Sequence, residues 1–156
     1  MRFTALIVVI ILSLPAVIAA QTCAAPGDFS TLSAAVIQSV NTERATRGLP
    51  ALKPDPELAA TAQAHACEMG KRGYFSHEGR NGSTVMARAK RQGYKACLIA
   101  ENIALGQGDV AQVMASWMGS KGHRANILRR GVSDTGVGVA LQKGRLVWVQ
   151  VFARPC

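Results

Sequence analysis

The last strand-like segment of the chain constrains the fold most. Residues 146–152, LVWVQVF, are apolar at successive positions rather than at alternate ones. A strand that faces water on one side alternates apolar and polar residues, so this strand should be covered on both faces. Val137 to Leu141 forms a second strand, and Gln142–Gly144 is the turn before Arg145 to Phe152. We therefore expect a hairpin with helices packed on both of its sides.

Helical patterns occupy most of the chain before this hairpin. Ser30 or Thr31 can cap a first helix that ends at Gly48, and Asp55 can cap a second, with Pro56 at its first position and Gly73 at its end. The remaining expected elements are a polar loop over 74–82, a helix from a Ser83 cap to about Gln92, an apolar run from Leu98 to Leu105, a helix after an Asp109 cap, and a helical turn at Ala125–Leu128. Helices first and a hairpin last predict the α+β class, specifically an α-β-α sandwich with a small antiparallel sheet between helices.

The first twenty residues resemble a secretory signal peptide. A basic start at Arg2 precedes the apolar residues 5–20, which end in small Ala19 and Ala20. The alternative is a membrane anchor, but the apolar run is shorter than the roughly 20 residues that span a bilayer. We predict a signal peptide over 1–20, an N-terminal segment over 21–31 and one domain over 32–156. No later run is long enough to span a membrane, so we expect a secreted protein, extracellular or periplasmic.

All four cysteines lie in the predicted mature part. An even number of cysteines in an exported chain indicates disulfides. The alternative, a cysteine metal site, is disfavoured because no pair has Cys-x-x-Cys spacing. Four cysteines allow three pairings. Of these we predict Cys67 with Cys97 and Cys23 with Cys156, the second of which would join the two ends of the mature chain.

The formal net charge is +9 at pH 7. Basic residues gather in two stretches, around residues 88–95 and 121–130. Such charge suits an anionic surface as partner, while its plainer interpretation is a solvated helix face. Aromatic residues make up 5% of the chain and do not interleave with the basic stretches. A base-stacking surface requires such residues, so we expect no specific nucleic-acid partner.

Two histidines and one glutamate are candidates for chemistry. His77 lies in the polar loop and His123 at the start of a short turn, while Glu101 interrupts the apolar run CLIAENIALG. A carboxylate in apolar surroundings must be paired, hydrogen-bonded or metal-bound. Two imidazoles and one carboxylate can form an open Zn²⁺ site. The alternatives are a buried salt bridge from Glu101 to Arg88 or Arg124, and structural hydrogen bonds for the histidines. His65, on the inner face of the second helix, is expected to be a core hydrogen-bonder.

Five segments resemble one family in their order along the chain. They are VNTERATRGLPAL (40–52), YFSH (74–77), AENIALG (100–106), ASWMGSKGHRANIL (115–128) and VGVALQKGRLVWVQVF (137–152). Together they resemble the CAP superfamily of cysteine-rich secretory proteins, antigen 5 and pathogenesis-related proteins, most closely its bacterial secreted branch with an SCP-like domain. The resemblance implies an α-β-α sandwich, in agreement with the order of elements.

The resemblance also implies a cleft with two histidines and two acidic residues that binds a divalent metal in some members. By position, the cleft residues are His77, Glu101, Ser120 and His123. Ser120 stands where the second glutamate is expected, and a serine hydroxyl is a poorer ligand than a carboxylate. Metal binding is therefore expected to involve His77, Glu101 and His123 and to be weak, with Zn²⁺ the first candidate.

Three functions are compatible with these residues. The first is a ligand- or partner-binding module of the cell envelope or exterior, which takes a lipid, a cell-wall component or a protein. The second is a metal-dependent peptidase or esterase that uses His77, Glu101 and His123, for which no general base is evident. The third is a structural envelope protein. The sequence thus leaves enzymatic activity open and favours the binding module.

Overall fold

The computed structural model describes residues 23–156, so the predicted signal peptide, residues 1–20, lies outside the described residues. The described elements are α1 (Phe29–Ala45), β1 (Lys53–Pro54), α2 (Pro56–Arg72), α3 (Val85–Arg91), β2 (Ala96–Leu105), α4 (Val110–Gly119), α5 (Lys121–Ile127), β3 (Asp134–Gln142) and β4 (Arg145–Pro155). Across residues 23–156, no helix has both the length and the apolar character needed to cross a bilayer.

The four strands form one sheet in the order β1-β3-β4-β2. The predicted hairpin is β3 and β4, which pair antiparallel, and β2 pairs antiparallel with the other side of β4. The two-residue β1 pairs parallel with β3, at Lys53 with Asp134 and Pro54 with Thr135. The sheet is therefore mixed rather than purely antiparallel, and the strand that makes it so is too short to carry a strand pattern. This order leaves β2 as an edge strand.

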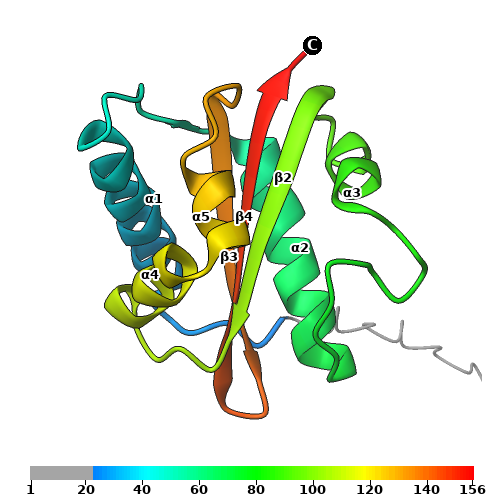
Figure 1. Cartoon of the computed structure of the whole chain (residues 1–156). Coiled ribbons are helices and arrows are strands. Elements are labelled where there is room, and N and C mark those ends of the chain that lie inside the picture. Colours follow the sequence, from blue (N-terminus) through cyan, green and yellow to red (C-terminus); the bar gives the residue numbers. More distant parts are fainter. Residues whose placement is uncertain (1–22) are drawn as a thin grey trace, which may run out of the picture.

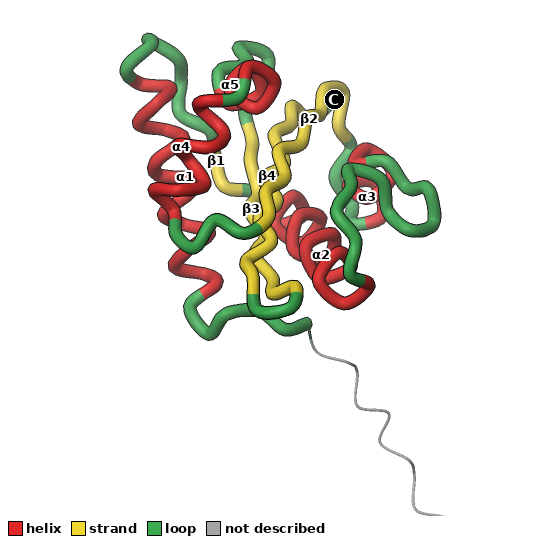
Figure 2. Tube along the Cα trace, turned by 60° about the horizontal axis from the view of Figure 1, so that its bottom comes forward, coloured by secondary structure: helices red, strands yellow, loops and turns green. Residues whose placement is uncertain are grey.

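Helices cover both faces of the sheet, which confirms the predicted α-β-α sandwich (Figure 1). Along β4, Trp148 and Phe152 enter one core with α1, α4 and α5, whereas Val149 and Val151 enter a second core with α2. Both views place α1, α4 and α5 on one side and α2 and α3 on the other (Figure 2). The continuous apolar pattern of β4 follows from these two cores.

Helix α2 lies directly on β3. A side chain at Gly136 would collide with the backbone of Leu58, and one at Gly138 with the backbone of Ala62. The side-chain amide of Gln63 extends from α2 to the outer edge of β3, where it accepts from the N–H of Val139 and donates to its carbonyl, both at 2.9 Å. The amide therefore satisfies the two backbone groups that a neighbouring strand would otherwise pair.

The predicted disulfide pairing is wrong. The bonds join Cys23 to Cys67 and Cys97 to Cys156, with Cα separations of 5.4 and 4.8 Å. Antiparallel pairing sets the start of β2 beside the end of β4, which brings the last two cysteines together. The N-terminal segment instead runs past the other end of β3, where Ala24 accepts from the N–H of Leu141. The two chain ends are thus fixed at separate places and not to each other.

The helix boundaries follow the predicted caps with small shifts. Asp55 caps α2 through the N–H of Leu58, Gly73 ends that helix in a left-handed conformation, and Asp109 caps α4. Thr84 rather than Ser83 caps α3, and α1 begins at Phe29 without a side-chain cap. The predicted turn at Ala125–Leu128 is the second half of α5, which starts at Lys121.

Candidate functional site

Glu101 lies between a histidine and an arginine. Its Oε1 is 2.9 Å from Nδ1 of His77, and its Oε2 accepts from Nη2 of Arg88 at 2.6 Å. The side chain of Glu101 is 2% exposed and that of His77 is 57% exposed. Both carboxylate oxygens are therefore engaged below the surface, whereas the imidazole of His77 extends outward from its partner.

Two buried side chains hold the loop that carries His77. Nη1 of Arg88 donates to the carbonyl of His77 at 2.9 Å and to that of Ser83 at 2.7 Å. His65, on α2, makes a 2.8 Å hydrogen bond to the carbonyl of Ser76 through Nε2. Because a carbonyl only accepts, Nε2 of His65 carries the proton. Arg88 thus links α3, the loop and β2, and the alternative prediction of an Arg88–Glu101 salt bridge is confirmed together with the His77 contact.

A second network fixes the helix that carries His123. Asn102, fully buried on β2, donates to the backbone carbonyl of His123 at 3.1 Å. Asn126, one turn further along α5, donates to the Asn102 side chain at 2.9 Å and to the carbonyl of Glu101 at 3.3 Å. The two asparagines therefore connect β2 to α5, and Asn126 occupies a backbone carbonyl of the edge strand β2.

A buried arginine ties the far end of α5 to α1. Arg44 is fully buried, and its Nη1 donates to the carbonyls of Ile127 and Arg129 at 2.8 and 3.0 Å. Its Nε donates to the carbonyl of Pro50 at 2.9 Å. These carbonyls include one at the C-terminus of α5, where a cation is favourable. The helix that carries His123 is thus held at both of its ends.

The surroundings of His123 and His65 both lower the pKa of the imidazole. Burial, together with the nearby charge of His77, lowers the pKa of His123 below its usual value. Burial is also the largest cause that lowers the pKa of His65, opposed by Glu101 and reinforced by Arg88. The effect of His77 on the pKa of His123 indicates that the two imidazoles face the same part of the molecule. At neutral pH, His123 therefore presents a neutral ring.

Ser120 occupies the junction between two helices of the site. It ends α4 and begins α5, three residues before His123, and its hydroxyl makes no capping hydrogen bond. Its side chain is half-buried. Ser120 therefore lies close to His123 along the chain, and its predicted role in binding stays a prediction.

The three predicted metal ligands do not fit a preformed three-ligand site. Both oxygens of Glu101 already contact protein groups, Oε1 the ring of His77 and Oε2 the guanidinium of Arg88. Among residues 23–156, no group of three or more His, Cys, Asp or Glu side chains is placed to hold a metal ion. Nε2 of His77 stays available to a cation on an exposed ring, whereas Nδ1 of His123 is buried without a hydrogen-bond partner. Zn²⁺ binding by His77, Glu101 and His123 stays a prediction.

A small polar cavity lies behind the site, between α2 and α3. Its volume is about 180 Å³, and its lining includes His65, Glu68 and Arg88. Nδ1 of His65 and Nε of Arg88 are buried with no hydrogen-bond partner in the protein. The two residues that hold the His77 loop therefore each keep one unpaired nitrogen, and water is the natural partner in a polar cavity of this size.

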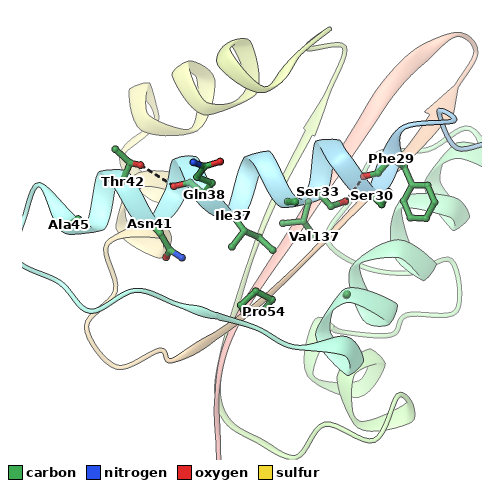
Figure 3. Close-up of a pocket in the computed structure, with 12 residues that line it drawn as sticks. Phe29, Ser30, Ser33, Ile37, Gln38, Asn41, Thr42, Ala45, Pro54 and Val137 are labelled. Carbon is green, nitrogen blue, oxygen red and sulfur yellow. Dashed lines mark hydrogen bonds between the residues drawn. The ribbon is translucent and has the colours of Figure 1, made fainter.

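A larger cavity lies elsewhere, along α1. A mainly apolar groove of about 770 Å³ follows α1, and Figure 3 shows Ile37, Pro54 and Val137 projecting into it from α1, β1 and β3. Phe29 at its end is 41% exposed. The lining contains neither His77 nor Glu101 nor His123, so this groove is separate from the candidate site. The residues that line it are Phe29, Ser30, Ser33, Ala34, Ile37, Gln38, Asn41, Thr42, Ala45, Pro54, Ala59 and Val137.

Sequence reasoning missed several residues that build the site. Arg88 appears there only as one alternative partner of Glu101, and Asn126 and Arg44 are not identified. Their roles depend on contacts between segments far apart in the chain, such as the 83 residues between Arg44 and Ile127. The signal that was available is the polar pair Glu101–Asn102 within an apolar strand, because two buried polar side chains need partners.

Comparison with known proteins agrees with this architecture. The model of the cysteine-rich secretory protein family, CAP, matches residues 37–152. An uncharacterized protein of Bacillus subtilis, YkwD, is 34% identical over 131 residues, which cover 84% of this chain and 50% of that protein. The chain thus spans about half the length of this relative.

Solved structures show the same fold. An extracellular protein from Bacillus anthracis that contains an SCP domain has a TM-score of 0.73 and 28% identity, with 81% of this chain and 41% of that chain covered. An outer surface protein of Borrelia burgdorferi has a TM-score of 0.76 and 18% identity, with 86% and 100% covered. These relatives are extracellular or surface proteins, and the two disulfides of this chain are consistent with secretion. The match over residues 37–152 and the shared fold show that the chain belongs to the cysteine-rich secretory protein (CAP) family.

Proposed function

We propose that the protein is a secreted binding module, extracellular or periplasmic, which engages a ligand or partner of the cell envelope at the His77–Glu101–His123 site. In this proposal the site holds its ligand through the two imidazoles and performs no reaction. Glu101 orients His77 and does not act on the ligand itself.

One observation supports this proposal above the others. A general base must have a free lone pair within reach of the substrate. Glu101 is buried, and its two oxygens face Arg88 and His77. At the position where the family resemblance implies a second glutamate, this chain has Ser120. Burial and these two partners support a positioning role for Glu101 rather than proton abstraction, and they leave the exposed ring of His77 as a group that can meet a ligand.

A divalent cation fits this proposal only as a weakly held component. The two imidazoles would supply its protein ligands, and water would complete the shell. A neutral His123 helps, because a metal ligand must be deprotonated. The cation would then strengthen or select the ligand without being required for the fold.

The proposal is tested by titration of the secreted, oxidised protein with Zn²⁺ in a calorimeter. The same titration is made with His77→Ala, His123→Ala and Glu78→Gln. Glu78 is the matched control, because it is an exposed carboxylate beside His77 in sequence. Peptide and ester hydrolysis are then assayed with and without a chelator.

Zinc binding that is lost in both histidine variants, kept in Glu78→Gln and accompanied by no turnover supports a binding module. Turnover that needs metal and disappears in both histidine variants overturns it in favour of a hydrolase. Absence of both zinc binding and turnover in the natural protein would overturn the proposal and leave a structural envelope role.

A further inference from the structure

We propose that the surface formed by α3, β2 and α5 binds a flexible linear polyanion, a chain of repeated phosphate or carboxylate groups, which lies across the His77–Glu101–His123 site. This inference rests on the proposed function and deepens it, because it names the chemical class of the ligand. It is carried by the distribution of charge along the chain and by the place of the charged elements in the fold.

Acidic residues are nearly absent from the part of the chain that builds this surface. Residues 79–133, which supply α3, β2, α4 and α5, contain two acidic residues, Glu101 and Asp109, and Asp109 caps the N-terminus of α4. Glu101 is buried and paired with Arg88, so it adds no free negative charge to the surface. The exposed cations of α3 and α5 therefore have no carboxylate within their own helices.

The cations stand on both sides of the site. Figures 1 and 2 both place β2, which carries Glu101, between α3 and α5. We define the basic face as the exposed cations of these helices and of the turns that follow them. They are Lys90, Arg91, Lys95, Lys121, Arg124, Arg129 and Arg130.

Most carboxylates lie on other elements. Glu43 is on α1 and pairs with Arg47, Glu57 is on α2, and Asp134 accepts from Tyr94 at the start of β3. Glu78, in the loop beside His77, is the exposed carboxylate nearest to the site in sequence. Cations therefore outnumber exposed carboxylates on α3 and α5, the two helices on either side of β2. Such an excess of positive charge raises the local concentration of anions and their association rate.

The distribution favours a polymer over a bilayer or a single small ion. Cations on two separate helices can each meet a different group of one extended chain. A helix that lies in a bilayer interface needs a broad apolar face. Near the site, the large apolar side chains that are exposed are Met86 on α3 and Phe75 in the loop that carries His77, which do not form such a face. Arginine, which supplies four of these seven cations, also pairs with phosphate through two parallel hydrogen bonds.

The test measures binding of fluorescently labelled inorganic polyphosphate to the secreted, oxidised protein over a range of salt concentrations. The variant Lys90→Gln/Arg124→Gln removes one cation from each side of the site. The matched control Lys143→Gln/Arg145→Gln removes the same charge from the β3–β4 turn, where both side chains are exposed. Vesicles of phosphatidylglycerol and uncharged dextran are the comparison ligands, and circular dichroism verifies that each variant is folded.

We expect polyphosphate to bind and dextran not to bind. For a flexible polyanion each neutralised group contributes roughly 0.7 to the slope of log K against log salt. The Lys90→Gln/Arg124→Gln variant should therefore lower the steepness of that slope by about 1.4 and weaken binding at least tenfold at low salt, whereas the control pair should leave both nearly unchanged.

Equal losses in both pairs would show an effect of net charge alone and would overturn the inference. Binding to vesicles but not to polyphosphate would overturn it in favour of a membrane surface, and no binding to either would also overturn it. Metal-dependent turnover in the hydrolysis assay would overturn the binding-module proposal but would not change the polyphosphate measurements. The failure of the proposed function and the failure of this inference can therefore be distinguished.

Discussion

Asn102 and His123 are joined by a hydrogen bond from the buried carboxamide of the first to the backbone carbonyl of the second, at 3.1 Å. Asn102 follows Glu101 on β2, and His123 lies on α5. The bond therefore fixes the position of His123 along β2 relative to Glu101. No side chain of the site itself has to take part in this alignment.

Replacing Asn102 with alanine should destabilise the protein and release His123. The carbonyl of His123 and the amide of Asn126 would lose a partner, and an unsatisfied buried group costs about 1–3 kcal/mol. The pKa of His123 should rise toward its usual value as its burial decreases. Urea denaturation and an NMR titration of the imidazole measure the two effects.

The control for this prediction is Gln38→Ala, on the exposed side of α1, which should change stability by less than about 0.5 kcal/mol. An unchanged His123 pKa would show that Asn102 does not position this helix.

Arg88→Met should be among the most destabilising single substitutions. It leaves Glu101 buried without its cation and removes donors from the carbonyls of His77 and Ser83. Removing one partner of a buried pair costs about 3–5 kcal/mol. Arg91→Met, the same change on the exposed side of α3, should cost less than about 0.5 kcal/mol. Adding Glu101→Gln to Arg88→Met should recover part of the loss, and strictly additive losses would contradict direct coupling.

Acid should weaken the protein through His65. Burial lowers the pKa of this histidine in the folded state, while the unfolded chain keeps the usual value of 6.5. The unfolded state therefore binds more protons as the pH falls through that value, and stability must decrease in the same interval. His123 acts with the same sign. Melting curves between pH 8 and about pH 5 should show a smaller decrease for His65→Gln than for the natural protein. Parallel curves would mean that His65 does not contribute.

The two disulfides should each contribute strongly to stability. They connect residues 44 and 59 positions apart, and the chain-entropy model gives about 4 kcal/mol for loops of these lengths. Cys23→Ala/Cys67→Ala and Cys97→Ala/Cys156→Ala should both lower the midpoint of guanidinium denaturation. Peptide mapping without reduction checks the pairing directly, and a fragment that links Cys67 to Cys97 would contradict the fold described above.

Local signals in the sequence predicted the elements well. Asp55, Pro56 and Gly73 mark the ends of α2 because caps and left-handed glycines act within a few residues. The unbroken apolar pattern of β4 predicted helices on both faces, since each face must be covered. The short β1 was missed because its two residues, Lys53 and Pro54, carry no periodicity. Strand pairing of this kind depends on a partner some 80 residues away.

Long-range relationships were predicted less well. The disulfide choice was wrong because it assumed that the chain ends meet, whereas strand register decides which cysteines are neighbours. Glu101 was identified as a residue that needs a partner, but periodicity could not choose between His77, Arg88 and Arg124. Both His77 and Arg88 proved to be partners. The two basic stretches were visible in the sequence, whereas their position on either side of β2 depends on how α3 and α5 pack.

The pairing of the Gln63 side chain with Val139 bears on how this protein behaves when crowded. An open strand edge invites the same edge of another molecule, and repeated pairing of this kind leads to aggregates. Here the amide already occupies both backbone groups of Val139, and Ala24 accepts the N–H of Leu141 nearby. At high protein concentration, copies of the protein would therefore find no long free edge on β3 along which to polymerise.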